Sequence, residues 1–114
     1  MDESLRVTGQ DWLYAVGDVN KRALLTHQGK YQARIAGAAI AARAAGEPVA
    51  DRAWGAHAAT ADHDAVPQVV FTDPEAASVG LSLAEAQEAG HRVRAVDVDL
   101  SSVAGAGLYG EGYT

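Results

Sequence analysis

The feature that most constrains this chain is a run of alanines between Leu24 and Ala45 that stops at a glycine and a proline. Eight alanines fall between Ala33 and Ala45, and alanine has the highest helix propensity of all residues. Gly46 and Pro48 follow, and both are typical of the end of a helix. The sequence therefore predicts one long helix over residues 24–45.

One face of this helix is apolar and built mostly from small side chains. Gly37 lies among the alanines, where the lack of a Cβ permits another backbone to approach closely. A small apolar face of this kind favours a helix packed on a sheet. The residues at helical spacing on this face are Tyr31, Ile35, Ala38, Ala39 and Ala42.

The composition limits both the core and the possible chemistry. The chain has 114 residues, 48% of them hydrophobic, but only 6% are aromatic and one is Phe. Because alanine buries little area, the core is small even for a single domain. Cysteine is absent, which excludes a disulfide scaffold, a thiolate zinc site and thiol chemistry within these residues.

The net charge of −6 argues against a surface for nucleic acid or an anionic membrane, because both require clustered basic side chains. No stretch reaches the roughly 18 apolar residues that a membrane span needs. We therefore expect a cytoplasmic protein with no nucleic-acid or membrane partner.

Short elements are predicted on either side of the helix. Residues 5–7 and 12–16 read as two strands, the second buried because residues 13–16 lack polar interruption. Residues 46–66 show little periodicity and are predicted to be a linker. A strand at 68–71 and a turn at 72–75 follow.

Two further elements are predicted beyond that turn. Ser82 and Glu85 have the spacing of a capping box and open a short helix that ends at Gly90. Val93, Val96, Val98 and Leu100 then indicate another strand.

Two local patterns are not interpreted as ligand sites. Residues 105–110 (GAGLYG) match GxGxxG, but no helix follows to hold a pyrophosphate, so a glycine-rich hairpin loop is predicted. The spacing of His57, Asp62, His63 and Asp64 resembles no structural zinc pattern. These four are predicted to be solvated linker residues, and no metal site is expected.

A more specific pattern lies at the end of the second predicted strand. Open α/β sheets bind ligands beyond the carboxyl ends of their strands, and there Gly17 permits close approach of a ligand while Asp18 offers a carboxylate to vicinal hydroxyls. A helix starting near residues 24–27 adds unpaired N–H groups and a positive dipole end. The pattern alone leaves an alternative open, in which Asp18 simply caps a turn.

Two motifs, in order, resemble one known family. Residues 14–19 (YAVGDV) and 23–27 (ALLTH) resemble the second flavin-binding motif of the pyridine nucleotide-disulfide oxidoreductases. Residues 66–75 (VPQVVFTDPE) and 77–82 (ASVGLS) resemble the opening of that family's C-terminal dimerisation domain.

The resemblance implies an α/β chain made of two partial domains. Residues 1–45 would be the end of a doubly wound FAD-binding domain, residues 46–66 a linker, and residues 67–114 the first half of an α+β dimerisation domain. Full-length members of the family are several times longer, so we expect a fragment. Gly29 stands where many relatives have Ala.

The resemblance also implies which residues contact FAD. Asp18, preceded by Gly17, would bind the ribityl hydroxyls. Leu25, Thr26 and His27 would present backbone amides to the pyrimidine end of the isoalloxazine, where negative charge gathers on reduction.

NAD(P)H is the implied co-substrate, with Leu24 and Val70 near its nicotinamide. No catalytic residue is expected within residues 1–114, because the family's dinucleotide fingerprint, redox cysteines and His–Glu pair have no counterpart there.

The implied function is therefore part of an FAD-dependent oxidoreductase that passes electrons between NAD(P)H and a disulfide or related acceptor. The fragment would be inactive alone, and the parent protein would be a homodimer joined through the C-terminal region. The alternative is a non-catalytic interaction module that oligomerises through residues 67–114, because an unpaired sheet edge recruits partners.

Overall fold

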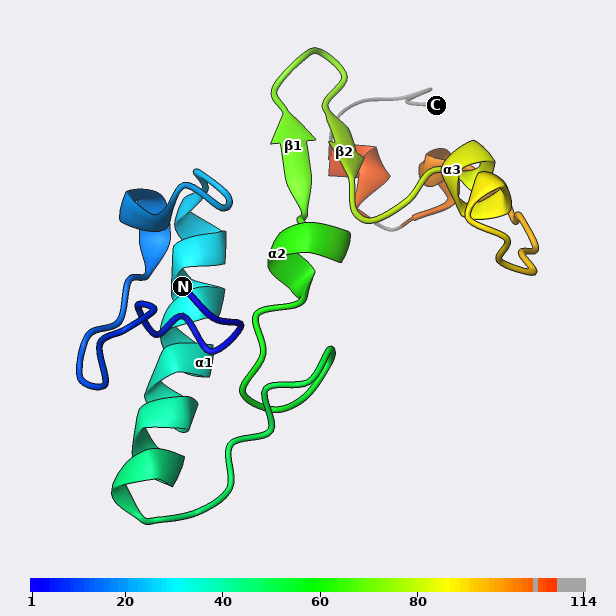
Figure 1. Cartoon of the computed structure of the whole chain (residues 1–114). Coiled ribbons are helices and arrows are strands. Elements are labelled where there is room, and N and C mark those ends of the chain that lie inside the picture. Colours follow the sequence, from blue (N-terminus) through cyan, green and yellow to red (C-terminus); the bar gives the residue numbers. More distant parts are fainter. Residues whose placement is uncertain (104, 109–114) are drawn as a thin grey trace. The chain divides into compact units, whose positions relative to one another are not determined.

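A computed structural model describes residues 1–103 and 105–108. The chain forms two compact units, Met1–Leu81 and Ser82–Thr114, and Figure 1 labels their helices and strands. The first unit contains the 3-10 turn η1 (Gly17–Asn20), helices α1 (Thr26–Ala44) and α2 (Ala61–Asp64), and strands β1 (Gln68–Val70) and β2 (Ala76–Ser78). The second contains helix α3 (Leu83–Glu88) and the 3-10 turns η2 (Leu100–Ser102) and η3 (Ala106–Leu108).

Helix α1 confirms the long helix that the alanines predict. The helix ends at Ala44, two residues before Gly46. Gly46 has a φ of +71°, and its N–H donates to the carbonyl of Arg43 at 3.1 Å. The N–H of Glu47 reaches back to the carbonyl of Ala42 at 2.8 Å. These bonds satisfy carbonyls that the last turn of a helix otherwise leaves unpaired.

The buried face of α1 differs in part from the predicted one. Ala39 and Ala42 are buried as expected, but Ala38 is exposed, and the buried face continues through Gln28 and Gln32. These two glutamines occupy the same stripe one turn apart. Sequence reasoning missed them because it followed apolar residues only.

The expected sheet beneath α1 is wrong for the described residues. The N-terminal segment and residues 58–62 cover this helix instead, and the core cluster consists of Leu5, Ala36 and Ala59. Tyr14, Tyr31 and Ile35 pack around it. Ala59 of this loop shares the core cluster with Ala36 of α1, so a loop packs on the helix where a sheet was expected.

The two strands predicted before residue 17 amount to one antiparallel bridge between Arg6 and Tyr14. The second was expected to be buried, which is wrong: the side chain of Trp12 is 76% exposed and Leu13 is also exposed. A buried strand requires neighbours along both edges, and no other described segment pairs with this one.

Polar contacts fasten the N-terminal segment to α1. The Asp2 carboxylate accepts hydrogen bonds from the N–H and hydroxyl of Ser4, at 3.0 and 2.8 Å, and from the N–H of Arg6 at 3.0 Å. From the last turn of α1, Arg43 donates to the hydroxyls of Tyr14 at 2.7 Å and Ser4 at 2.9 Å. Its guanidinium also lies 5.7 Å from the centre of the Tyr14 ring, within cation–π range.

Strands β1 and β2 form an antiparallel hairpin with Val69 opposite Ala77. β1 confirms the strand predicted at 68–71 but ends one residue earlier, at Val70. The predicted turn at 72–75 lies in the connection between the strands. β2 was not predicted, because Ala76–Ser78 contains no β-branched or aromatic residue. Every residue of both strands is exposed.

The second unit opens with the predicted capping box. The Ser82 hydroxyl accepts from the N–H of Glu85 at 3.3 Å, and the Glu85 carboxylate accepts from the N–H of Ser82 at 2.8 Å. The strand expected between Val93 and Leu100 is wrong, since residues 91–99 form neither helix nor strand. Within the described part of this unit no segment pairs with them, and a strand is stable only when paired.

Residues 105–108 of the predicted glycine-rich hairpin include the turn η3. Tyr109 and Gly110, which complete the pattern, lie outside the described residues. None of the described helices is long and apolar enough to cross a membrane.

The Asp2 contacts predict a stability that falls in acid. Partial burial raises the pKa of the Asp2 carboxyl, but hydrogen bonds from Ser4 and Arg6 outweigh it, so the pKa lies below its usual value. The ionised carboxylate therefore stabilises the fold above about pH 4, and this contribution disappears as the pH falls through the lowered pKa.

We expect Asp2→Asn to reduce the free energy of unfolding at pH 7 and to approach the wild-type value near pH 3. Denaturant unfolding across this pH range measures both curves. Asp51→Asn, at an exposed carboxylate, is the control and should leave the curve unchanged. A constant difference between Asp2→Asn and wild type at all pH values would contradict the prediction.

Candidate functional site

The Gly17–Asp18 pair begins the turn η1. Gly17 has a φ of +74°, a conformation that costs other residues about 1–2 kcal/mol. Asp18 is exposed, and only its backbone carbonyl is engaged, accepting from the N–H of Lys21 at 3.1 Å. No described group donates to the Asp18 carboxylate, so a turn-capping role for this side chain finds no support in the structure.

The side chain of Gln32 holds η1 against α1. Its Oε1 accepts from the N–H of Gly17 and from the amide of Asn20, each at 2.7 Å. The Asn20 amide also donates to the carbonyl of Ala15 at 3.1 Å. The backbones are close as well: a Cβ added at Gly29 would lie 3.4 Å from the Cα of Gly17. The turn that presents Asp18 is therefore fixed by α1.

Asp62 completes this network from the start of α2. Its Oδ1 accepts from Nε2 of Gln28 at 3.0 Å, and its Oδ2 accepts from Nε2 of Gln32 at 2.9 Å. The Asp62 side chain is fully buried, and Nη1 of Arg22 lies 3.8 Å from Oδ2. A buried carboxylate requires donors of this kind to replace its hydration.

The prediction that Asp62 is a solvated linker residue is therefore wrong, because α2 turns its carboxylate toward the two glutamines of α1. His57 and His63 make other contacts: Nδ1 of His57 accepts from the N–H of Ala50 at 2.8 Å, and Nε2 of His63 lies 3.6 Å from the Glu3 carboxylate. Among the described residues, no three His, Asp or Glu side chains gather in a way that could hold a metal ion.

The first turn of α1 presents two of the three amides that the sequence singled out. Leu25 is the N-cap residue, and its N–H bonds locally to the carbonyl of Ala23 at 2.9 Å. Within the described part of the chain, no acceptor meets the N–H of Thr26 or His27. Nε2 of His27 lies 2.8 Å from the carbonyl of Pro67, which links this turn to the residues before β1.

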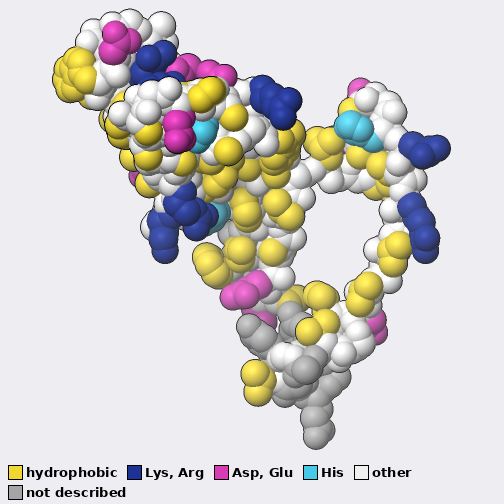
Figure 2. Space-filling view, turned by 90° about the horizontal axis from the view of Figure 1, so that it is seen from below, with side chains coloured by type: hydrophobic (Ala, Val, Ile, Leu, Met, Phe, Trp, Pro, Cys, Tyr) yellow, Lys and Arg dark blue, Asp and Glu magenta, His cyan; other side chains and the backbone are white. Residues whose placement is uncertain are grey.

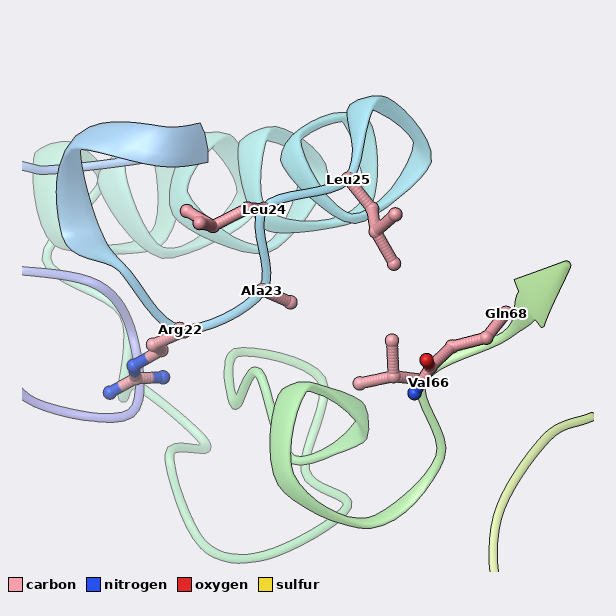
Figure 3. Close-up of a pocket in the computed structure, with 6 residues that line it drawn as sticks. All are labelled: Arg22, Ala23, Leu24, Leu25, Val66 and Gln68. Carbon is pink, nitrogen blue, oxygen red and sulfur yellow. The ribbon is translucent and has the colours of Figure 1, made fainter. Parts of the chain in front are cut away.

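A cavity of about 340 Å³ opens beside the first turn of α1. Figure 3 shows the side chains of Leu25 and Val66 pointing toward each other across it, while the guanidinium of Arg22 points away. Val70 does not line the cavity but shares a face of β1 with Gln68, two residues before it. The lining residues are Arg22, Ala23, Leu24, Leu25, Val66 and Gln68.

The predicted site residues thus fall into three groups. Leu24 and Leu25 share the cavity, and Thr26 and His27 lie at its side in the first turn of α1. Gly17 and Asp18 belong to η1, and Val70 ends β1. Gln28, Gln32 and Asp62, which the sequence reasoning did not select, support the second group. Two glutamines four residues apart on an otherwise alanine-lined face were the available signal.

Comparison with known proteins gives consistent matches. The profile of the family described as "Pyridine nucleotide-disulphide oxidoreductase, dimerisation domain" matches residues 66–114. "Dihydrolipoyl dehydrogenase 2" of Haloarcula marismortui is 40% identical over 83 residues, which is 73% of this chain and 15% of that protein. The "Dihydrolipoyl dehydrogenase" of Chlamydia pneumoniae is 36% identical over 88 residues, 77% of this chain and 16% of that protein.

The "Dihydrolipoyl dehydrogenase" of Bacillus subtilis is 40% identical over 78 residues, 68% of this chain and 14% of that protein. The chain thus spans about one-seventh of the length of these curated relatives. Only 49 residues lie between Val66 and Thr114, so an 83-residue match includes at least 34 residues before Val66. No solved structure matches the chain significantly.

The different backbone conformations of Gly17 and Gly37 predict that replacing them with alanine changes the free energy of unfolding in opposite directions. We expect Gly17→Ala to lower the free energy of unfolding by about 1 kcal/mol or more, because its φ is positive. Gly37→Ala in α1, where an added Cβ meets nothing within 4 Å, should raise it by up to about 1 kcal/mol. Denaturant unfolding measures both, and shifts of the same sign would contradict the prediction.

Proposed function

Because the chain belongs to the pyridine nucleotide-disulfide oxidoreductase family, we propose that it forms part of an FAD-dependent oxidoreductase. The protein would pass electrons between NAD(P)H and a disulfide or related acceptor. The observation that carries the proposal is an exposed carboxylate at Asp18 beside a helix start whose Thr26 and His27 amides are unpaired among the described residues.

Residues 1–45 would be the end of the FAD-binding domain, residues 46–66 the connection, and residues 67–114 the first part of the dimerisation domain. The family match over residues 66–114 supports the last assignment. The matches that extend before Val66 support a shared origin for the earlier residues. The packing of Asp62 on α1 makes the connection a structured one.

The donors and acceptors of the site fit FAD. Gly17 has no side chain to obstruct a ligand, and a Cβ added there would meet nothing within 4 Å. The Asp18 carboxylate, an acceptor without a described donor, would accept hydrogen bonds from ribityl hydroxyls. The backbone N–H groups of Thr26 and His27 would meet the pyrimidine end of the flavin.

The first turn of α1 would favour the reduced cofactor. FAD, when bound, supplies the chemistry of accepting a hydride and passing on two electrons. The N-terminal end of a helix carries partial positive charge, so the amides of Thr26 and His27 would stabilise the negative charge that reduction brings. Leu25, whose N–H is bonded to Ala23, would act through its side chain in the cavity.

Leu24 and Val70 would lie near the nicotinamide. Leu24 is largely exposed at the cavity rim, and Val70 is exposed at the end of β1. Apolar side chains at these places would exclude water from a hydride transfer. The curated relatives are dihydrolipoyl dehydrogenases, so a dihydrolipoyl dithiol is the first electron donor to assay in the protein encoded by the complete reading frame.

Asp18 provides the direct test of the flavin site. We expect the protein encoded by the complete reading frame, reconstituted with FAD, to show bound-flavin absorbance. Asp18→Ala should weaken its FAD binding at least about tenfold through loss of charge-assisted hydrogen bonds. Asp51→Ala, at an exposed carboxylate away from η1, is the matched control and should bind like wild type. A colourless protein that takes up no FAD would overturn the proposal.

We propose further that the protein is a homodimer joined through its C-terminal region. Figure 2 shows hydrophobic side chains exposed on one face. Val69, Val70 and Phe71, on and after β1, are exposed large hydrophobic residues. An exposed hairpin of this kind has open edges and apolar faces that a partner can cover. The same observation supports the second candidate, a non-catalytic module that oligomerises without flavin.

Phe71 tests the dimer. Its side chain is 83% exposed, and we expect Phe71→Lys to shift the protein from dimer to monomer in native mass spectrometry across a concentration series. Trp12→Lys, at an exposed aromatic residue outside residues 66–114, should leave the dimer intact. A wild-type monomer at every concentration would refute the dimer, and an oligomer that never binds FAD would favour the interaction module.

A further inference from the structure

We propose that Gln32 and Asp62 act as positioning residues for Asp18, with the Asp62 carboxylate fixing which end of the Gln32 amide faces the turn η1. The inference rests on the proposed flavin site and extends it to two buried side chains that would not touch the cofactor. Asp62 lies in the segment before β1, and Gln32 lies in the second turn of α1.

The two ends of the Gln32 amide face different partners. The Gly17 N–H and the Asn20 amide are both donors, so the end of Gln32 that meets them must be its oxygen. The other end is then the NH₂ group, which requires an acceptor. Because an ionised carboxylate only accepts hydrogen bonds, Asp62 permits one orientation of Gln32 and opposes the reversed one.

The second oxygen of Asp62 is occupied in the same way. It accepts from Nε2 of Gln28 at 3.0 Å, one helical turn before Gln32. Arg22 approaches from the loop between η1 and α1, with Nη1 3.8 Å from the carboxylate and Nη2 donating to the carbonyl of Asp2 at 3.0 Å. The carboxylate is thus held by two glutamines of α1, with Arg22 nearby, and cannot turn away from Gln32 without leaving amide donors unpaired.

Gln32 holds the residues on either side of Asp18 in the chain. The Gly17 N–H that Gln32 holds belongs to the residue directly before Asp18, and the Asn20 amide belongs to the residue two after it. With both flanks fixed, the backbone of Asp18 is held, and with it the position from which the exposed carboxylate extends. A preorganised acceptor binds hydroxyls more tightly than a mobile one, because less conformational freedom is lost on binding.

A reversal of polarity tests this arrangement. In Gln32→Glu the amide that donates to Asp62 is lost. The carboxylate introduced at position 32 then lies next to that of Asp62, so two negative charges repel each other. In the double variant Gln32→Glu with Asp62→Asn, the amide introduced at position 62 donates to the carboxylate at position 32, and its oxygen still accepts from Gln28. The bonds to Gly17 and Asn20 are retained, with donor and acceptor exchanged between positions 32 and 62.

Two readouts are measured in the protein encoded by the complete reading frame. Hydrogen exchange at the Gly17 N–H reports on the turn without any cofactor, and titration with FAD reports the binding affinity. We expect Gln32→Glu to speed Gly17 exchange and to weaken FAD binding about tenfold each, the effect of losing one buried hydrogen bond. The double variant should restore both to within about threefold of wild type.

Matched controls repeat each change at an exposed position. Asp64→Asn lies two residues from Asp62 on the exposed side of α2, and Gln10→Glu lies in an exposed turn; neither should alter either readout. If Gln32→Glu fails to fold, a folded double variant with wild-type FAD affinity supports the proposal, and a double variant that also fails overturns it.

The remaining outcomes separate this inference from the proposed function. A double variant no better than Gln32→Glu in either readout overturns the positioning role. Restored Gly17 exchange with FAD affinity still weakened also overturns it, because the turn would then not govern flavin binding. Wild-type protein that binds no FAD refutes the proposed function, while Gly17 exchange in the same variants still shows whether the polarity exchange holds the turn.

Discussion

The buried carboxylate of Asp62 is the contact on which the candidate site most depends. It accepts from two glutamines of α1, and one of these holds the N–H of Gly17 and the amide of Asn20. A charge with no solvent exposure is costly to bury unless donors surround it, so its position and theirs are mutually determined. Through it, the segment before β1 is joined to the turn that carries Asp18.

Because the buried face of α1 is lined mainly by alanines, polar contacts contribute much of what holds the covering loops on this helix. Ala36, Ala39 and Ala42 bury little surface each, and among the large apolar residues that the structure describes only Leu5 is fully buried. Hydrogen bonds from Arg43 near one end of α1, and from Gln28 and Gln32 near the other, therefore fasten the covering loops in place. Meanwhile the hairpin of β1 and β2 keeps its apolar side chains exposed, which agrees with a match to a dimerisation domain.

The parts of the fold that sequence predicted share a local cause. The end of α1 at Gly46, the capping box of Ser82 and Glu85, and the strand at β1 each depend on residues within a few positions of one another. The buried strand before Gly17 and the strand after Val93 were predicted wrongly for the opposite reason. Strands need partners that are distant in sequence, and the described residues supply none for these two.

The features of the candidate site also divide into those with a local cause and those that depend on distant segments. The sequence alone determined a helix that starts near residues 24–27 and a glycine before Asp18, because helix propensity and backbone conformation are local properties. Only the tertiary structure decided that the Leu25 amide is used locally, that Leu24 and Leu25 share a cavity with Val66, and that Asp62 is buried. These outcomes depend on which groups from distant segments meet, and a donor finds its acceptor only when the chain has folded.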